Sequence, residues 1–110
     1  MEIEFESEYQ LEIKNQFYDS LDEVLRYLLE VSVKSHNVFK KEITTCIDKI
    51  FVYPLSFPIL KTESKKRVYR HINFRKNYHL IYYVSDSTIY LCDIQHIRRN
   101  PKSLRFLDDI

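Results

Sequence analysis

Hydrophobic and polar positions alternate at the start of the chain and then change their period. Residues 1–14 place most apolar side chains on odd positions and mainly glutamate on even ones, which predicts a half-buried strand, most clearly over residues 9–14. From residue 17 the apolar positions follow one helical face, at Phe17, Leu21, Val24, Leu25 and Leu28. A second stretch repeats this spacing at Phe39, Ile43, Cys46, Ile47 and Ile50. Residues 35–37 lie between the two stretches, so the pattern predicts an antiparallel helix pair connected there.

The second half of the chain has the character of a β-sheet. Pro54 and Pro58 end helical structure, and the segment TESKK is a polar, basic linker. Three runs rich in β-branched and aromatic residues follow, RVYRHINFR, YHLIYYV and TIYLCDI, with connections short enough for antiparallel pairing. Because the chain has no glycine, Asn77 and Asp86 are predicted to take the left-handed turn positions. The sequence therefore predicts an α+β domain: a strand, an antiparallel helix pair and a three-stranded antiparallel meander, with the helices on one face of an antiparallel sheet.

Length and composition narrow the class of protein. A chain of 110 residues is expected to form one domain, spanning residues 1–110. Hydrophobic residues make up 45% and charged residues 30%, which is typical of a globular protein. No apolar run could span a bilayer and the glutamate-rich start does not resemble a secretory signal, so a cytoplasmic protein without membrane contact is expected. Cys46 and Cys92 lie within apolar patterns, which favours small buried hydrophobic residues over a redox pair.

Charge is distributed unevenly along the chain. Residues 1–30 carry nine acidic and two basic side chains, a balance of −7, whereas residues 31–110 carry seven acidic and fifteen basic ones, a balance of +8. This asymmetry favours an anionic partner for the C-terminal part, either nucleic acid or an acidic protein segment. The alternative is that the two parts neutralise one another across the fold.

The basic residues after the last apolar run suggest chemistry on a phosphodiester. Cleavage of RNA by its own 2′-hydroxyl needs a group that accepts a proton, cations that stabilise negative charge, and an acid for the leaving oxygen. Histidine and arginine supply these functions without a metal or another cofactor. We therefore assign candidate catalytic roles to His96, Arg70 and Arg98, and candidate nucleic-acid-binding roles to Arg75, Lys76, Arg99 and Lys102.

Each of these residues also has a structural explanation. His96 could cap the last strand, and Arg70 could pair with Asp93 or with an N-terminal glutamate. The basic residues after His96 could form a solvated tail. A metal site made of His71, His79 and His96 is disfavoured, because these side chains need not share a face and no carboxylate or cysteine spacing supports it.

The order of elements and three segments together resemble the RelE/ParE family of bacterial toxins, including its plasmid-stabilisation branch. The segments are NVFKKEITTCIDKIFVYP, YRHINFRKNYHLIYYV and IYLCDIQHIRRNP, and the last contains a His-x-Arg-Arg sequence similar to the family's terminal motif. The resemblance covers about residues 9–104, and residues 1–8 form an acidic extension without a counterpart.

The resemblance implies the toxin of a type II toxin–antitoxin system that is neutralised by a cognate antitoxin. It implies either ribosome-dependent mRNA cleavage (an mRNA interferase) or inhibition of DNA gyrase. Two departures weigh against the nuclease: His79 stands where ribosome-dependent members usually have arginine, and the tyrosine often found near the chain end is missing, unless Tyr69 or Tyr83 replaces it. Gyrase inhibition, a non-catalytic basic nucleic-acid-binding module and a protein that only docks an antitoxin-like helix therefore stay open.

Overall fold

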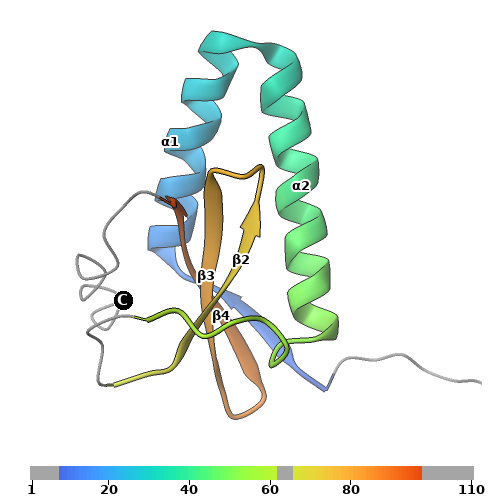
Figure 1. Cartoon of the computed structure of the whole chain (residues 1–110), viewed down its shortest axis with the longest axis vertical. Coiled ribbons are helices and arrows are strands. Elements are labelled where there is room, and N and C mark those ends of the chain that lie inside the picture. The colour runs from blue at the N-terminus through green and yellow to red at the C-terminus, as the bar shows by residue number, and fades with distance from the viewer. Residues whose placement is uncertain (1–7, 62–65, 98–110) are drawn as a thin grey trace, which may run out of the picture.

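Six elements follow one another in the order that the sequence predicts, and the α+β class is confirmed (Figure 1). The computed structural model describes residues 8–61 and 66–97. The elements are β1 (Gln10–Ile13), α1 (Asn15–Val31), α2 (Val33–Val52), β2 (Tyr69–Phe74), β3 (Tyr78–Ser85) and β4 (Thr88–His96). Among the described residues, neither helix combines the length and the apolar run needed to cross a bilayer.

A single residue, Ser32, separates the two helices, so the prediction of a connection at residues 35–37 is wrong. Ser32 has an extended backbone, with φ −166° and ψ 126°, and it both ends α1 and begins α2. Its hydroxyl oxygen accepts a hydrogen bond from the backbone N–H of Ser35 at 3.3 Å, which satisfies one of the unpaired donors of the first turn of α2. Polar residues resemble a loop in sequence, yet they are tolerated in a first helical turn that a serine caps.

The four strands form one sheet in the order β1-β4-β3-β2. Strands β2, β3 and β4 form the predicted antiparallel meander. The expectation of a wholly antiparallel sheet is wrong for β1, which pairs with β4 in parallel. An alternating pattern determines which face of a strand is buried, but it does not determine the neighbour or the direction of pairing.

Three non-glycine residues adopt left-handed backbone conformations at the hairpin turns. Asp86 has φ 54°, as predicted, whereas the β2–β3 turn uses Arg75 (φ 50°) and Lys76 (φ 61°) in place of Asn77. Conformations of this kind cost roughly 1–2 kcal/mol per residue outside glycine. The basic turn between β2 and β3 is therefore held by the pairing of the strands on either side of it.

Apolar side chains pack on both faces of the sheet. The larger cluster lies between the sheet and the helices and includes Phe17, Leu28, Phe39, Ile43, Cys46, Ile50, Ile72, Phe74, Leu80, Tyr82, Ile89, Leu91 and Ile94. We call the opposite side of the sheet the far face; there a smaller cluster comprises Leu60, Tyr69, Ile81, Tyr83 and Cys92. Both cysteines are free and buried, as predicted, and burial raises the pKa of the Cys92 thiol to about 12. The thiols are therefore protonated near neutral pH and have little nucleophilic character.

The connection after α2 is fastened to the sheet at several points. The phenol of Tyr82 donates to the carbonyl of Pro54 at 2.6 Å. The N–H of Leu60 donates to Tyr69 O at 2.8 Å, and the N–H of His71 donates to Pro58 O at 3.1 Å, so the connection covers the start of the outer edge of β2. The helices cover the other face, which leaves the far face only partly covered by the described residues (Figure 1).

Candidate functional site

Arg70 holds the connection after α2 in place. It alternates with Ile72 on the helix side of β2 and is half-buried. Its guanidinium donates to the backbone carbonyl of Phe57 at 2.7 Å. This contact favours a structural role for Arg70 over a catalytic one. Its partner is a backbone carbonyl, whereas the sequence suggested Asp93 or an N-terminal glutamate.

The end of β4 and the β2–β3 turn meet at one end of the sheet. Tyr78 pairs with His96 across the strands, and the N–H of Ile97 donates to Asn77 O at 2.7 Å. His96 is exposed, and its ring centroid lies 5.5 Å from that of Tyr78 in an edge-on arrangement. Tyr78 therefore brings a phenol next to His96. The sequence had suggested Tyr69 or Tyr83 for this role, but both lie on the far face, away from His96.

Two of the predicted nucleic-acid-binding residues lie in the same turn. Arg75 donates to Ser35 O at 3.3 Å and places its Nε 3.9 Å from a Glu42 carboxylate oxygen, so part of its charge is directed at α2. Lys76 is exposed. The structure thus brings His96, Arg75 and Lys76 to one end of the sheet and leaves Arg70 away from them. The other three candidates lie outside the described residues: Arg98, Arg99 and Lys102.

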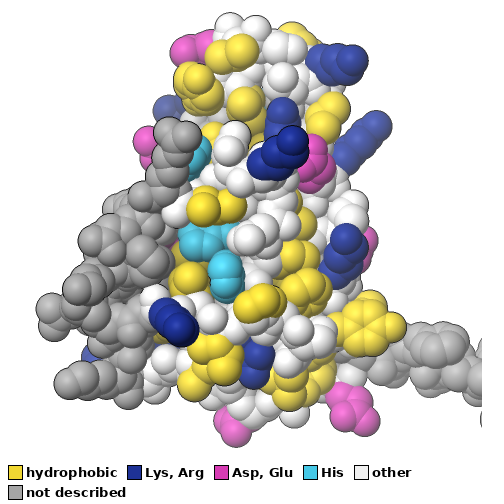
Figure 2. Space-filling model, in the orientation of Figure 1, with side chains coloured by type: hydrophobic (Ala, Val, Ile, Leu, Met, Phe, Trp, Pro, Cys, Tyr) yellow, Lys and Arg dark blue, Asp and Glu magenta, His cyan; other side chains and the backbone are white. Residues whose placement is uncertain are grey.

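His71 and His79, which the sequence disfavoured as metal ligands, contact one another on the far face. Their Nδ1 atoms are 3.1 Å apart, and the rings of His71 and His79 meet edge-on with centroids separated by 5.2 Å. Figure 2, which looks onto the far face, shows histidine side chains near its centre. His96 pairs with Tyr78, which packs on the helix side, so the three histidines do not converge. Within residues 8–61 and 66–97, no three His, Cys, Asp or Glu side chains are grouped to hold a metal.

A chain of buried polar groups continues from this histidine pair across β4. Gln95 pairs with His79, and its side-chain N–H donates to the Asp93 carboxylate at 2.6 Å. Asp93 is fully buried and also accepts hydrogen bonds from the Ser20 hydroxyl and, at 2.8 Å, from the N–H of Ile94. We call His71, His79, Gln95 and Asp93 the polar relay.

Two buried atoms of the polar relay have no hydrogen-bond partner: Nε2 of His79 and Oε1 of Gln95. A buried polar atom without a hydrogen bond lowers the stability of the fold. Gln95 Oε1 is an acceptor, and His79 Nε2 is a donor when it carries the ring proton. We therefore assign the proton of neutral His79 to Nε2, on the strand pair that also carries Gln95 Oε1 as an acceptor. His79 Nδ1 then accepts from His71 Nδ1–H. Nε2 is then the nitrogen of the half-buried His71 ring that can accept a proton, and the hydrogen bond with Asn73 favours the charged ring.

Burial keeps both histidines neutral near pH 7. It lowers the pKa of His71, although a hydrogen bond with Asn73 acts in the opposite direction. Burial, together with the neighbouring His71, lowers the pKa of His79 to about 4. A neutral imidazole with one accessible nitrogen is the form that a general base requires.

The lowered pKa of His79 predicts a loss of stability in acid. The unfolded side chain has a pKa of roughly 6.5, so between pH 6.5 and about 4 the unfolded state binds more protons than the native state. The contribution is fully present above pH 6.5 and decreases as the pH falls through this window, by about 2 kcal/mol at pH 5. Urea unfolding from pH 4.5 to 8 measures this slope.

His79→Phe is the matching variant, because it removes the titrating group and keeps an aromatic ring in the buried site. It should make the acid slope of the unfolding free energy shallower, and the lowered pKa of His71 should account for part of the slope that remains. The control is His36→Ala on α2, which should leave the slope unchanged. An equally steep slope in His79→Phe would show that another group causes the acid destabilisation.

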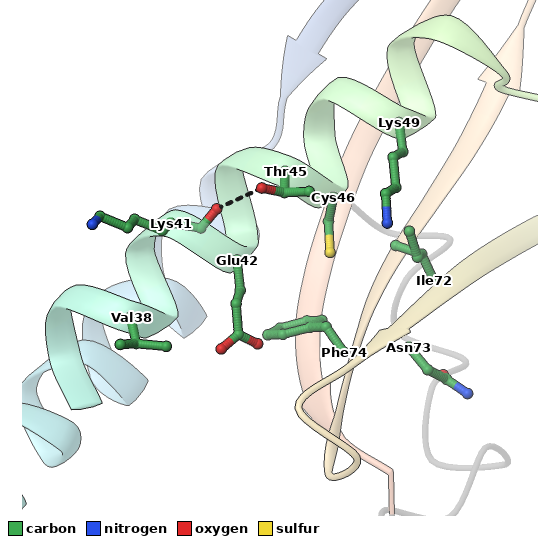
Figure 3. A pocket seen from close by; sticks show the side chains of 9 residues that line it. All are labelled: Val38, Lys41, Glu42, Thr45, Cys46, Lys49, Ile72, Asn73 and Phe74. Carbon is green, nitrogen blue, oxygen red and sulfur yellow. Dashed lines mark hydrogen bonds between the residues drawn. The ribbon is translucent and has the colours of Figure 1, made fainter. Parts of the chain in front are cut away.

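A groove of about 310 Å³ lies between α2 and β2 (Figure 3). Lys41 and Lys49 flank it, and the Cys46 thiol points from the helix towards the strand. Burial raises the pKa of this thiol, which makes it a poor nucleophile. None of the candidate catalytic residues is among the described residues that line the groove, so it offers a surface for contact and no catalytic group.

No family model matches the chain, and no curated protein matches it. The resemblance to the RelE/ParE family therefore stays a prediction from the sequence.

Proposed function

We propose that this chain is the toxin of a type II toxin–antitoxin system and that it cleaves mRNA without a metal, with the polar relay as its proton-transfer site. The observation that carries the proposal is the contact between two neutral histidines on the sheet face that the helices leave uncovered. The order of a strand, a helix pair and a three-stranded meander agrees with what the RelE/ParE resemblance implies. The proposed partners are a cognate antitoxin and the translating ribosome with its mRNA.

The chemistry begins at Nε2 of His71. This nitrogen accepts the proton of a ribose 2′-hydroxyl, and the oxygen attacks the adjacent phosphorus to form a cyclic phosphate as the bond to the 5′-oxygen breaks. The imidazolium of His71 then returns the proton to the leaving 5′-oxygen, so that the neutral ring is restored. While His71 is charged, its Nδ1–H donates to His79, which pairs across the strands with Gln95, the hydrogen-bond donor to the buried Asp93.

Charge on the phosphoryl oxygens requires a cation in addition to the histidines. Arg98 and Arg99 are the proposed sources, because they follow β4, the strand that carries Gln95 and Asp93. Arg70 is a weaker candidate, since its guanidinium binds the carbonyl of Phe57.

Induced expression in bacteria tests the proposal. The intact chain should arrest growth and produce cuts in mRNA on translating ribosomes, and the variant His71→Ala should do neither while still accumulating as folded protein. His36→Ala is the matched control and should remain toxic. Growth arrest with intact mRNA and loss of supercoiling by purified gyrase would instead identify a gyrase inhibitor, and the absence of any growth defect would reject the toxin assignment.

A further inference from the structure

Two cations and two aromatic rings form a ladder across the far face, at the end of the sheet opposite the basic β2–β3 turn. The rings of Tyr83 and Tyr90 stack with centroids 4.6 Å apart and an interplanar angle of 15°. The guanidinium carbon of Arg67 lies 4.4 Å from the centroid of Tyr83, and the ammonium nitrogen of Lys14 lies 4.9 Å from that of Tyr90. Stacked guanidinium and aromatic groups of this kind are held rigidly, since each supports its neighbour.

A groove of about 410 Å³ runs beside this ladder. Lys66 and Arg67 contribute positive charge to its wall, while Tyr83, Val84 and Tyr90 contribute aromatic and apolar surface. The described residues that line the groove include no carboxylate. Cations beside an aromatic wall match the two chemical features of a single nucleic-acid strand, its phosphates and its bases.

The groove and the polar relay lie on the same face of the sheet. Tyr69 pairs with Tyr83, and His71 pairs with Ile81, so all four side chains point to the far face. Along β3 the groove at Tyr83 is four residues from His79, which corresponds to ~13 Å of extended strand. A flexible strand lying along this face reaches both places with a few nucleotides.

We propose that the groove of Lys66, Arg67, Tyr83 and Tyr90 binds single-stranded RNA a few nucleotides away from the bond presented to His71. The inference extends the proposed function and rests on it for the substrate, RNA; the binding itself does not require cleavage. Arg67 contacts a phosphate. A base lies against the edge of the half-buried Tyr90, because Arg67, Lys14 and the stacking of the two tyrosines occupy the ring faces. The protein thereby holds its substrate at two positions on one face.

Binding is measured by fluorescence anisotropy with a labelled 2′-O-methyl RNA, which cannot be cleaved because it lacks the attacking hydroxyl. Arg67→Ala should weaken binding roughly tenfold and lower the slope of log affinity against log salt by about 1, the signature of one lost phosphate contact. Arg67→Lys should restore the salt slope and only part of the affinity, because the charge is kept and the planar stack is lost. Lys40→Ala, which removes an exposed cation on α2, is the control and should bind like the unchanged protein.

The outcomes separate this inference from the proposed function. His71→Ala removes no cation, so it should keep the salt slope of 2′-O-methyl RNA binding that Arg67→Ala lowers, even though it cannot cleave mRNA. If the protein cuts RNA and Arg67→Ala binds as tightly as the intact chain while retaining its circular dichroism spectrum, the groove is not an RNA site and only this inference fails. Competition by a glutamate-rich peptide at the same concentration as RNA would overturn it in favour of an acidic protein partner.

Discussion

Replacing Phe39 with alanine is expected to lower the free energy of unfolding by about 3–5 kcal/mol, the largest stability effect that the structure predicts. Phe39 is 0% exposed and projects from α2 into the cluster between the helices and the sheet. Its ring centroid lies 5.2 Å from that of Phe74 and 5.3 Å from that of Tyr78. Truncation therefore removes two edge-on aromatic contacts and leaves a cavity that the surrounding side chains cannot fill.

Urea denaturation monitored by far-UV circular dichroism measures the effect as a lower midpoint with an unchanged slope. Val38→Ala is the control at the adjacent position, where the side chain is 39% exposed, and it should cost less than about 1 kcal/mol. Tyr78 also contacts His96, so Phe39→Ala should increase the mobility of the end of the sheet that carries His96. A loss below about 1 kcal/mol in Phe39→Ala would contradict the packing described for this cluster.

His71→Ala is expected to reduce the rate of RNA cleavage by about 10²–10⁴, the range typical of a lost general base. The reason is that His71 contributes the accessible nitrogen of the polar relay, whereas His79 and Gln95 are buried behind it. The measurement is single-turnover cleavage of mRNA on programmed ribosomes with purified protein. The fold should be retained, because His71 is only half-buried and its N–H contact with Pro58 involves the backbone.

The pH dependence of the rate provides a second readout. Burial lowers the pKa of His71, so the proposed cleavage activity should persist at pH 6.5, the ordinary histidine pKa, and be lost only at lower pH, where the ring becomes protonated. Asn73→Asp is informative here, because a carboxylate at the exposed position that is hydrogen-bonded to His71 favours the charged ring and should move the acid limb of the profile to higher pH. His96→Ala tests the site suggested by the sequence. If His96→Ala abolishes cleavage and His71→Ala does not, catalysis belongs at the end of β4 and not on the far face.

The periodic segments of the chain made its elements predictable. Phe17 to Leu28 and Phe39 to Ile50 follow helical spacing, and the buried face of each helix comprises these residues. Pairing was less predictable, because the alternation around Leu11 does not say that β1 lies parallel to β4. The connection between the helices was placed wrongly, since a single capping residue, Ser32, replaced an expected loop.

The candidate site was harder to predict than the fold. His71 and His79 were visible in the sequence, but their contact depends on the register of the β2–β3 hairpin, in which His71 faces Ile81 and Asn73 faces His79. That register follows from a turn formed by Arg75 and Lys76 in left-handed conformations, which residue preferences do not suggest. The contribution of Gln95 could not be seen either, because a bulge between Ile81 and Tyr82 shifts its strand relative to β3.

The pairing of β1 with β4 has a consequence for synthesis. In the described sheet β1 hydrogen-bonds only to β4, the strand that lies farthest from it in the sequence. This pairing therefore closes the sheet last, after β4 has been made. Gln95 and Asp93 also belong to β4, which means that the polar relay forms only after this strand has been synthesised and has paired with β3. A nascent chain that has not yet reached β4 therefore lacks the side chains that complete the polar relay.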